Sequence, residues 1–535
     1  MVNIKASIQE TCGINLSYQK LARMPSCFKQ LQGFINGSFC VLIQDMNYTL
    51  RSLLYFFLIS TAVCHAQTFH RGNGSEPDSL NIHQAQGINS QNILLDLYEG
   101  LMTFDAKGLI IPGAITHYQV SEDQLQWHFY LNPHAKWSDG TSLTANDFLF
   151  AWQTAIDPQV AAPYRQLFNN LMRDGELNVT APHSLQLHIT LNYPDASFLN
   201  KLVLPIFFPL PSHNNDRRVS NGAFYLSQWD IQEKIHLLKN KHYHQADKVQ
   251  LKEVVYWVTE NQNSELLRFR ANELDLTETI PDHQIDWLKK NHPNELKIAP
   301  YYGTFFLGLN LNDSLLNNPK LRQALSASID RDILVNKVLK SGQQAAYAII
   351  PPVEPTPKDP LINIPKAKQL LADSGFNKET DHLEILYNNS DNQKKVALAV
   401  AAMWRQNLGI KSRLRNQEWK IFVNTRKSPN KQVFRSGWIA DYFSPINFLE
   451  LFHSNSHFNF YGMKQQKYDD LIDAMNTTTD PSLLNKLTIQ AEQILSDELP
   501  VIPLYHYVSR HLVAKHIKGY HDNLMDKHLS RYISK

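Results

Sequence analysis

The sequence contains no cysteine after position 64. Its four cysteines are Cys12, Cys27, Cys40 and Cys64. The rest of the chain can therefore form no disulfide, no thiolate metal site and no cysteine nucleophile. Its stability must come from a large hydrophobic core, which a chain of 535 residues with 43% hydrophobic residues can supply.

Short catalytic motifs and a strong charge of one sign are also missing. The sequence has no HExxH, no GxSxG and no phosphate-binding P-loop. The formal net charge is +2, which gives no electrostatic footprint for nucleic acid. These absences favour a binding protein over an enzyme, and we expect neither a cofactor nor a bound metal ion.

The N-terminal region has the pattern of a secretory signal peptide. Arg51 precedes an apolar run at residues 53–63, which is too short to span a bilayer. Cys64 and Ala66 then provide small residues at the −3 and −1 positions, so we expect cleavage after Ala66. An alternative is that Cys64 is a lipidated terminus. Cleavage leaves an almost neutral chain without cysteine.

Residues 1–45 lie upstream of this signal, where a signal peptide should begin the chain. We interpret Met46 as the true start and residues 1–45 as an over-extended reading frame. The alternative interpretation is a cytoplasmic extension of a membrane-anchored form.

Residues 435–442 (RSGWIADY) concentrate a cation, large aromatics and a carboxylate in one short stretch. The pattern predicts a strand that ends in a turn, with Pro445 close behind. Asp441 at the strand end, beside Trp438 and Tyr442, is suited to hold a positive group in a partly dry site. A structural ion pair is the alternative explanation.

Other motifs accompany this stretch in a fixed order. They are residues 137–141 (WSDGT), 147–148 (DF), 221–224 (NGAF), 330–338 (DRDILVNKV) and 416–420 (NQEWK). With residues 437–442, they resemble the periplasmic oligopeptide-binding proteins of ABC importers, over roughly residues 69 to 530. A set of ordered motifs is far more specific than any one of them.

The resemblance implies an α/β, two-lobed periplasmic-binding-protein fold of type II, in the peptide-binding class with an extra subdomain. A chain of this length is expected to divide into two or three lobes. The expected division is a signal peptide at 46–66, lobe I at 67–99, 211–300 and 506–535, the extra subdomain at 100–210, and lobe II at 301–505.

The resemblance also implies which residues meet a peptide. Asp441 matches the carboxylate that receives the α-amino group, which would cost several kcal/mol to bury without a counter-charge. Protein backbone would pair with the peptide backbone in the manner of a β-strand. The residues expected to provide that backbone are Gly437 and Ile439 on one side, and Gln86, Gly87 and Ile88 on the other.

Aromatic and cationic residues complete the expected site. Arg426 and Arg435 match positions that can serve the peptide carboxylate, for which a guanidinium is well suited. Aromatic walls are expected from Trp419 and Trp438, and the resemblance adds Tyr164 and Tyr301 to the residues that line the ligand.

Several polar positions leave their roles open. Gln393 stands where some relatives have histidine, and Leu339 where some have lysine, so the preferred peptide length or terminus can differ. Glu278 is a candidate partner for a second ammonium, such as that of diaminopimelate, or else a surface glutamate. His242 and His244 are a weak metal pattern, which we interpret as a solvent-facing loop.

Local patterns predict individual elements. Thr144 followed by Asp147 forms a capping-box pattern, which predicts a helix that begins after Thr144. Clean alternation predicts a strand at residues 185–191. Residues 394–408 predict a helix that Gly409 ends.

The function that these observations favour is extracytoplasmic capture of short peptides. The expected partners are the peptides, the permease subunits of an inner-membrane importer and its cytoplasmic ATPases, and the binding protein is expected to be a periplasmic monomer. Alternatives are a murein peptide, a dipeptide, a nickel chelate or haem as ligand, a peptidase that uses Asp441 and Glu278, or a structural or chaperone role.

Overall fold

The computed structural model describes residues 68–214, 216, 218–353 and 362–535, and residues 67–535 form one compact unit. The predicted signal peptide, its cleavage site after Ala66, the possible lipidation of Cys64 and the extension at 1–45 lie outside the described residues. No helix in the described ranges combines the length and the hydropathy that crossing a membrane requires.

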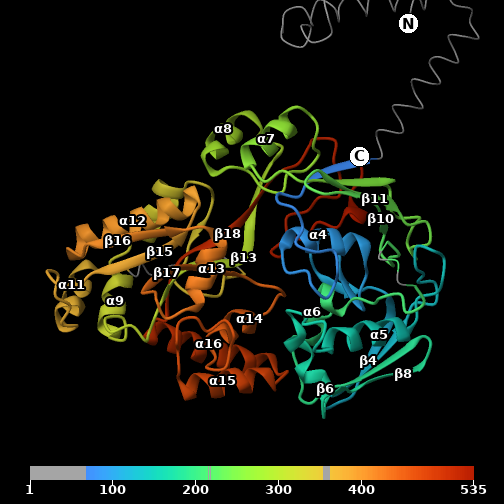
Figure 1. Cartoon of the computed structure of the whole chain (residues 1–535), viewed down its shortest axis with the longest axis horizontal. Coiled ribbons are helices and arrows are strands. Elements are labelled where there is room, and N and C mark those ends of the chain that lie inside the picture. Colours follow the sequence, from blue (N-terminus) through green and yellow to red (C-terminus); the bar gives the residue numbers. More distant parts are fainter. Residues whose placement is uncertain (1–67, 215, 217, 354–361) are drawn as a thin grey trace, which may run out of the picture. The chain divides into compact units, whose positions relative to one another are not determined.

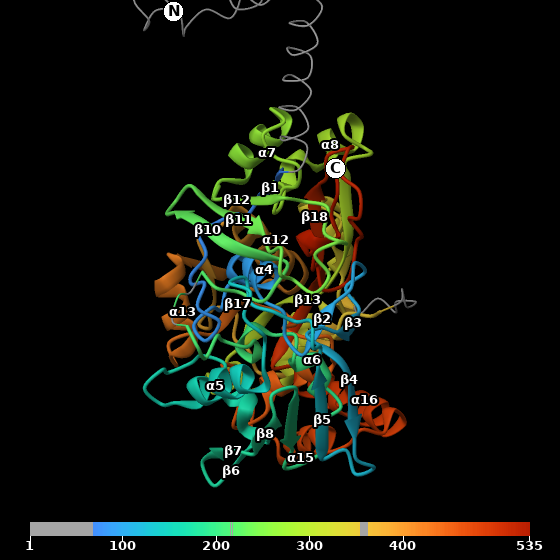
Figure 2. The same cartoon turned by 90° about the vertical axis from the view of Figure 1, so that its right-hand side faces the viewer.

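The first sheet has the strand order β1-β12-β11-β10, and β1 runs parallel to β12. Figure 1 labels β10 and β11 of this sheet, and Figure 2 labels all its strands. Its strands are β1 (Thr68–Gly72), β10 (Phe224–Asp230), β11 (Lys234–Lys239) and β12 (Glu253–Trp257). The helices that follow β1 and β12 in the sequence are α4 (Ile88–Leu97), after β1, and α7 (Gln262–Arg270) and α8 (Ile285–Asn291), after β12.

A second sheet, antiparallel, has the order β4-β5-β9-β8. Its strands are β4 (Ile115–Val120), β5 (Gln126–Leu131), β8 (Val179–His183) and β9 (Gln186–Thr190). Nearby in sequence are the pairs β2 (Met102–Phe104) with β3 (Ile110–Pro112) and β6 (Met172–Arg173) with β7 (Glu176–Leu177), and helices α5 (Ala145–Ile156) and α6 (Phe198–Lys201).

The third sheet has the order β14-β18-β13-β17-β15-β16. Its strands are β13 (Leu296–Leu309), β14 (Gln344–Ala345), β15 (Leu383–Asn388), β16 (Ser412–Gln417), β17 (Val433–Ile439) and β18 (Val501–Leu512). The helices of this region are α9 (Pro319–Ala327), α10 (Arg331–Ile333), α11 (Ile364–Asp373), α12 (Asp391–Leu408), α13 (Trp419–Lys427), α14 (Ile446–Leu449), α15 (Gln466–Asn476) and α16 (Pro481–Glu498).

The long strands β13 and β18 pair antiparallel from Leu296 opposite Leu512 to Gly308 opposite Val501, and they run side by side in Figure 2. The domain limits expected near residues 300 and 505 fall inside these two strands. The division into lobe I, lobe II and an extra subdomain therefore stays a prediction.

The elements predicted from local patterns are present. Both hydrogen bonds of the capping box between Thr144 and Asp147 are made at the start of α5. Strand β9 covers most of residues 185–191. Helix α12 ends at Leu408, and Gly409 caps it with a φ of 75°, a left-handed conformation that glycine adopts without strain.

The interpretation of His244 as part of a solvent-facing loop is wrong. Its side chain is 4% exposed, and its Nε2 lies 2.6 Å from an oxygen of Glu99. The hydroxyl of Tyr243 donates to the other oxygen of Glu99 at 2.6 Å, and Arg531 contacts that oxygen as well. Burial alone would raise the pKa of Glu99, but the charge of Arg531 and the bond with His244 lower it to about 2.

Candidate functional site

A cavity of about 310 Å³ lies at the end of β17. The expected residues that line it are Gln86, Ile88, Tyr164, Tyr301, Trp438, Ile439 and Asp441. Its other lining residues are Gln91, Pro163, Ala440, Phe458 and Lys527. A second cavity, of about 320 Å³, shares Tyr164, Trp438, Asp441 and Phe458 with the first. The structure thus brings together residues that lie far apart in the sequence.

Asn447 fixes the backbone that carries Asp441. The backbone N–H of Asp441 donates to Asn447 Oδ1 at 3.0 Å, and the indole N–H of Trp438 donates to the same oxygen at 2.9 Å. Asn447 itself is only 2% exposed. These two bonds hold the turn after β17 and leave the Asp441 carboxylate among the cavity-lining groups.

The electrostatic setting of Asp441 suits a cationic ligand group. Burial raises the pKa of Asp441 to about 7; the positive charge of Lys527 opposes this rise, and the negative charge of Glu450 adds to it. A carboxylate in this setting gains stability when a further positive group comes close, because that group favours the ionised form.

One edge of β17 is available for backbone pairing. The N–H of Ala440 donates to the carbonyl of Tyr302 at 3.0 Å, and β17 pairs with β13 in the same register. Backbone groups alternate between the two edges of a strand, so those of Gly437 and Ile439 point away from β13. On that edge, β15 pairs with β17 only at Val433 and Phe434 among the described strands.

Arg426 and Arg435 do not line the 310 Å³ cavity, but they lie near each other. The guanidinium of Arg435 is 5.8 Å from the ring centroid of Trp419, and that of Arg426 is 4.7 Å from that of Phe460. The Nε atoms of both arginines are buried without a hydrogen-bond partner in the described part of the chain. Burial lowers the pKa of Arg426, and the charge of Arg435 lowers it further. Two such cations are suited to share an anion.

The backbone at Gln86 and Gly87 is already engaged. Both N–H groups donate to the carboxylate of Asp78, at 2.8 and 3.1 Å, and the Gly87 carbonyl accepts from the first turn of α4. The pairing of this segment with a peptide therefore stays a prediction. In this structure, the backbone groups that could pair with the peptide are others, such as the carbonyl of Gln86. Asp78 is a residue that the local sequence did not single out.

Glu278 is not a surface glutamate. It is partly buried, and its backbone N–H donates to Glu265 Oε1 at 2.5 Å. Burial raises the pKa of Glu278 to about 7; His511 lowers it and Asp526 raises it further. Burial also raises the pKa of Glu265 to about 8.

Two expected residues contribute in other ways. Trp419 is 49% exposed at the start of α13. The side-chain oxygen of Gln393 is buried without a hydrogen-bond partner among the described residues, so it can accept a bond from a ligand. The roles of both residues stay predictions.

Lys527 is the cavity residue that sequence reasoning missed. It is 7% exposed, and its Nζ donates to Gln91 Oε1 at 3.3 Å. Burial lowers the pKa of Lys527, while the negative charges of Asp526, Asp441 and Glu278 raise it. A single lysine in a polar C-terminal segment carries no local pattern that could have revealed this position.

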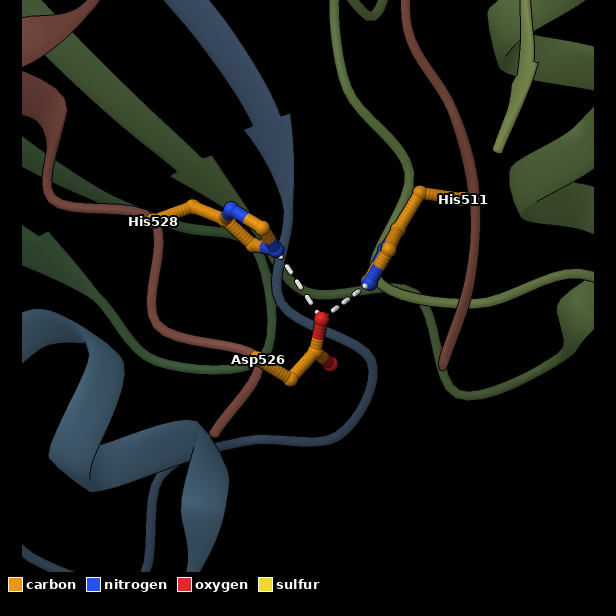
Figure 3. A group of neighbouring side chains, drawn as sticks. All are labelled: His511, Asp526 and His528. Atoms are coloured by element: carbon orange, nitrogen blue, oxygen red, sulfur yellow. Dashed lines mark hydrogen bonds and ion pairs between the residues drawn. The ribbon is translucent and has the colours of Figure 1, made fainter. Parts of the chain in front are cut away.

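His511, Asp526 and His528 form a compact group (Figure 3), and Lys527 lies between the last two in the sequence. Both Nε2 atoms lie 2.9 Å from the same oxygen, Oδ1 of Asp526, and Nδ1 of His511 lies 2.9 Å from the carbonyl oxygen of Thr277. In the described part of the chain, these are the three side chains spaced closely enough to hold a metal ion. Two N–H donors on one carboxylate oxygen account for the same geometry without a metal.

The chain matches a family model described as "Bacterial extracellular solute-binding proteins, family 5 Middle" over residues 110–460. The chain belongs to this family of solute-binding proteins. It is 34% identical over 487 residues to the periplasmic oligopeptide-binding protein OppA of Salmonella typhimurium. This match covers 85% of this chain and 90% of that protein. It is 32% identical to the periplasmic murein peptide-binding protein MppA of Escherichia coli, over 86% of this chain and 91% of MppA.

Solved structures of peptide-binding proteins are similar to this chain as well. The E. coli murein tripeptide-binding protein MppA superposes with a TM-score of 0.78 and 30% identity, covering 88% of this chain and 98% of that one. Haemophilus influenzae OppA in complex with the peptide RPPGFSPFR gives a TM-score of 0.76 and 31% identity, again covering 88% and 98%. The expected two-lobed α/β fold of the peptide-binding class is confirmed.

Proposed function

We propose that this protein captures short peptides in the 310 Å³ cavity and delivers them to an ABC-type peptide importer. The observation that carries the proposal is the buried carboxylate of Asp441, which lines a cavity at the end of a strand with an open edge. The similarity to oligopeptide- and murein peptide-binding proteins points to the same ligand class.

A peptide presents three chemical problems, and the site has a group for each. Its ammonium needs a counter-charge, which Asp441 supplies. Its backbone needs hydrogen-bond partners that do not depend on sequence, which the outward N–H and C=O groups of Gly437 and Ile439 supply. Its carboxylate needs a cation, and the unpartnered Nε atoms of Arg426 and Arg435 are the candidates.

The remaining parts of the proposal concern location and partners. The protein would act in the periplasm after cleavage behind Ala66, as a monomer. It would pass the peptide to the permease subunits of an importer. Cytoplasmic ATPases would drive transport through those subunits. A ligand that contacts both lobes would favour a closed form, and that form would be the one that docks.

Native mass spectrometry of the protein from its own host, followed by calorimetry, tests the proposal. We expect a co-purifying peptide and saturable heat with free-amine peptides of two to five residues. A matched N-acetylated peptide should bind much more weakly, because it brings no positive charge to Asp441. The absence of heat with every peptide in the panel would contradict the proposal.

The same panel separates the alternatives. The panel also includes a murein tripeptide, a dipeptide, a nickel chelate and haem. The partly buried Glu278 makes the murein peptide, which has a second ammonium, the second candidate. Intact recovery of a labelled peptide after incubation excludes a peptidase. Binding without saturation would point to a chaperone role.

A further inference from the structure

The C-terminal segment supplies a buried cation to the proposed peptide cavity. Lys527 lines the cavity together with Asp441, and its ammonium donates to Gln91 at 3.3 Å. The negative groups that act on this ammonium are Asp526, Asp441 and Glu278. A lysine so well buried needs carboxylates near it, because an unpaired buried charge is costly.

Asp526 is already compensated by other groups. Two imidazoles converge on its Oδ1 at 2.9 Å each, as Figure 3 shows. Burial would lower the pKa of His511, but Asp526 raises it to about 9, so this ring carries the charge that balances Asp526. His511 is also the first cation that acts on Glu278, whereas the cation that acts on Asp441 is Lys527.

The other charged groups nearby do not line the cavity, and one of them, Arg71, also lowers the pKa of Glu278. Arg71 donates to the carbonyl of His528 at 2.8 Å, and its charge lowers the pKa of the buried Asp96. Glu265 has its pKa raised to about 8 by burial, so it is mostly neutral near pH 7. Asp441 thus shares its cavity with one resident ammonium, so a peptide that adds a positive side chain to its α-amino group would place a third cation beside one carboxylate.

We propose that Lys527 is a specificity-determining residue that occupies the place of a second ligand cation, so that the cavity accepts a peptide with only one positive charge on its first residue. This inference rests on the proposed function. It also bears on the candidate role of Glu278, because that carboxylate already has His511, Arg71 and Lys527 as cations that act on it.

The test uses two nearly isosteric peptides that differ by one charge. The first residue is norvaline in one tripeptide and 2,4-diaminobutyrate in the other, each followed by two alanines. Calorimetry with the wild-type protein should show at least tenfold tighter binding of the norvaline peptide. The Lys527→Met variant keeps the aliphatic stem and removes the charge, so its preference should shift by at least tenfold toward the diaminobutyrate peptide.

Lys527→Arg keeps the charge and should keep the wild-type preference. Lys515→Met is the matched control, because Lys515 is an exposed lysine in the same segment. Thermal unfolding of each variant establishes that it is folded. Should Lys527→Met fail to fold, the wild-type preference alone decides, since equal binding of the two peptides would overturn the inference.

The two proposals fail in different ways. If the wild-type protein binds neither tripeptide nor any other peptide in the panel, the proposed function fails. If it binds the norvaline peptide but Lys527→Met leaves the ratio of the two affinities unchanged, only the role of Lys527 is overturned.

Discussion

Asp441 and Lys527 line one cavity, although Asp441 follows β17 and Lys527 belongs to the segment after β18. Each acts on the other: the charge of Lys527 lowers the pKa of Asp441, and the charge of Asp441 raises that of Lys527. The proposed site for a peptide amine therefore combines a carboxylate and an ammonium in one cavity, and the ligand amine is received in the presence of both.

Replacing Asp441 by asparagine keeps the side-chain volume and removes its charge. We expect peptide affinity to fall by about 10- to 100-fold, since a charge-assisted hydrogen bond contributes about 1.5–3 kcal/mol. The melting temperature should not fall, because a neutral side chain is cheaper to bury there. Calorimetry and thermal unfolding measure both effects. Asp470→Asn, at an exposed position of α15, is the control, and undiminished binding by Asp441→Asn would contradict the role.

Peptide binding should depend on pH through Asp441. Its pKa is about 7 in the folded protein without ligand, so the carboxylate must lose a proton before it can pair with an ammonium. Affinity should therefore fall by up to about tenfold per pH unit as the pH drops below 7. Calorimetry at pH 6 in buffers of different ionisation enthalpy should show release of about one proton per peptide. A pH-independent affinity between 5.5 and 7.5 would count against this linkage.

Protein stability should follow the opposite trend. The folded-state pKa values of Asp441 and Glu278 are raised, so protonation favours the folded form of each. Their contribution to stability is present at low pH and is lost as the pH rises from about 4 to about 7. Urea unfolding of the ligand-free protein should show that Asp441→Asn loses less stability over this range than the wild type does.

Gly437 leaves room for the hydroxyl of Tyr507. A Cβ at this position would lie 2.5 Å from that hydroxyl oxygen and 3.2 Å from the carbonyl oxygen of Thr304. Gly437→Ala should weaken peptide binding about tenfold, since Tyr507 or the strand edge must move. The double variant Gly437→Ala/Tyr507→Phe should recover most of the loss in calorimetry. If the double variant is as weak as the single one, the contact with Tyr507 is not the cause.

Asp147 should matter for stability and not for the ligand. Its carboxylate accepts bonds from Trp137, from the backbone and hydroxyl of Thr144, and from the backbone and hydroxyl of Ser212, and it is 2% exposed. Asp147→Ala leaves these buried donors unpaired, so we expect a loss of about 3–5 kcal/mol in the free energy of unfolding. Urea denaturation measures it against Asp470→Asn, which should change stability by less than about 0.5 kcal/mol.

The local sequence predicted the strands and helices that carry the site. It did not predict which charged side chains act on one another within the site. The turn after β17, with Asp441 and Trp438, follows from a strand pattern and a nearby proline, which depend only on neighbouring residues. The burial of Glu278 does not follow from its neighbours, because Glu265, His511 and Asp526 surround it from other parts of the chain. His244 was misjudged for the same reason, since Glu99 and Arg531 are distant in sequence.

The sequence by itself determined the family, the elements whose caps and periodicity are local, and the identity of Asp441 as the expected amine partner. Only the tertiary structure decided that Lys527 lies in the same cavity, that Asp526 is already compensated by His511 and His528, and that one edge of β17 is open at Gly437 and Ile439. The physical reason is that periodicity and capping are set by residues within one or two turns, whereas the charge of a buried site is the sum over side chains that meet only when distant segments pack together.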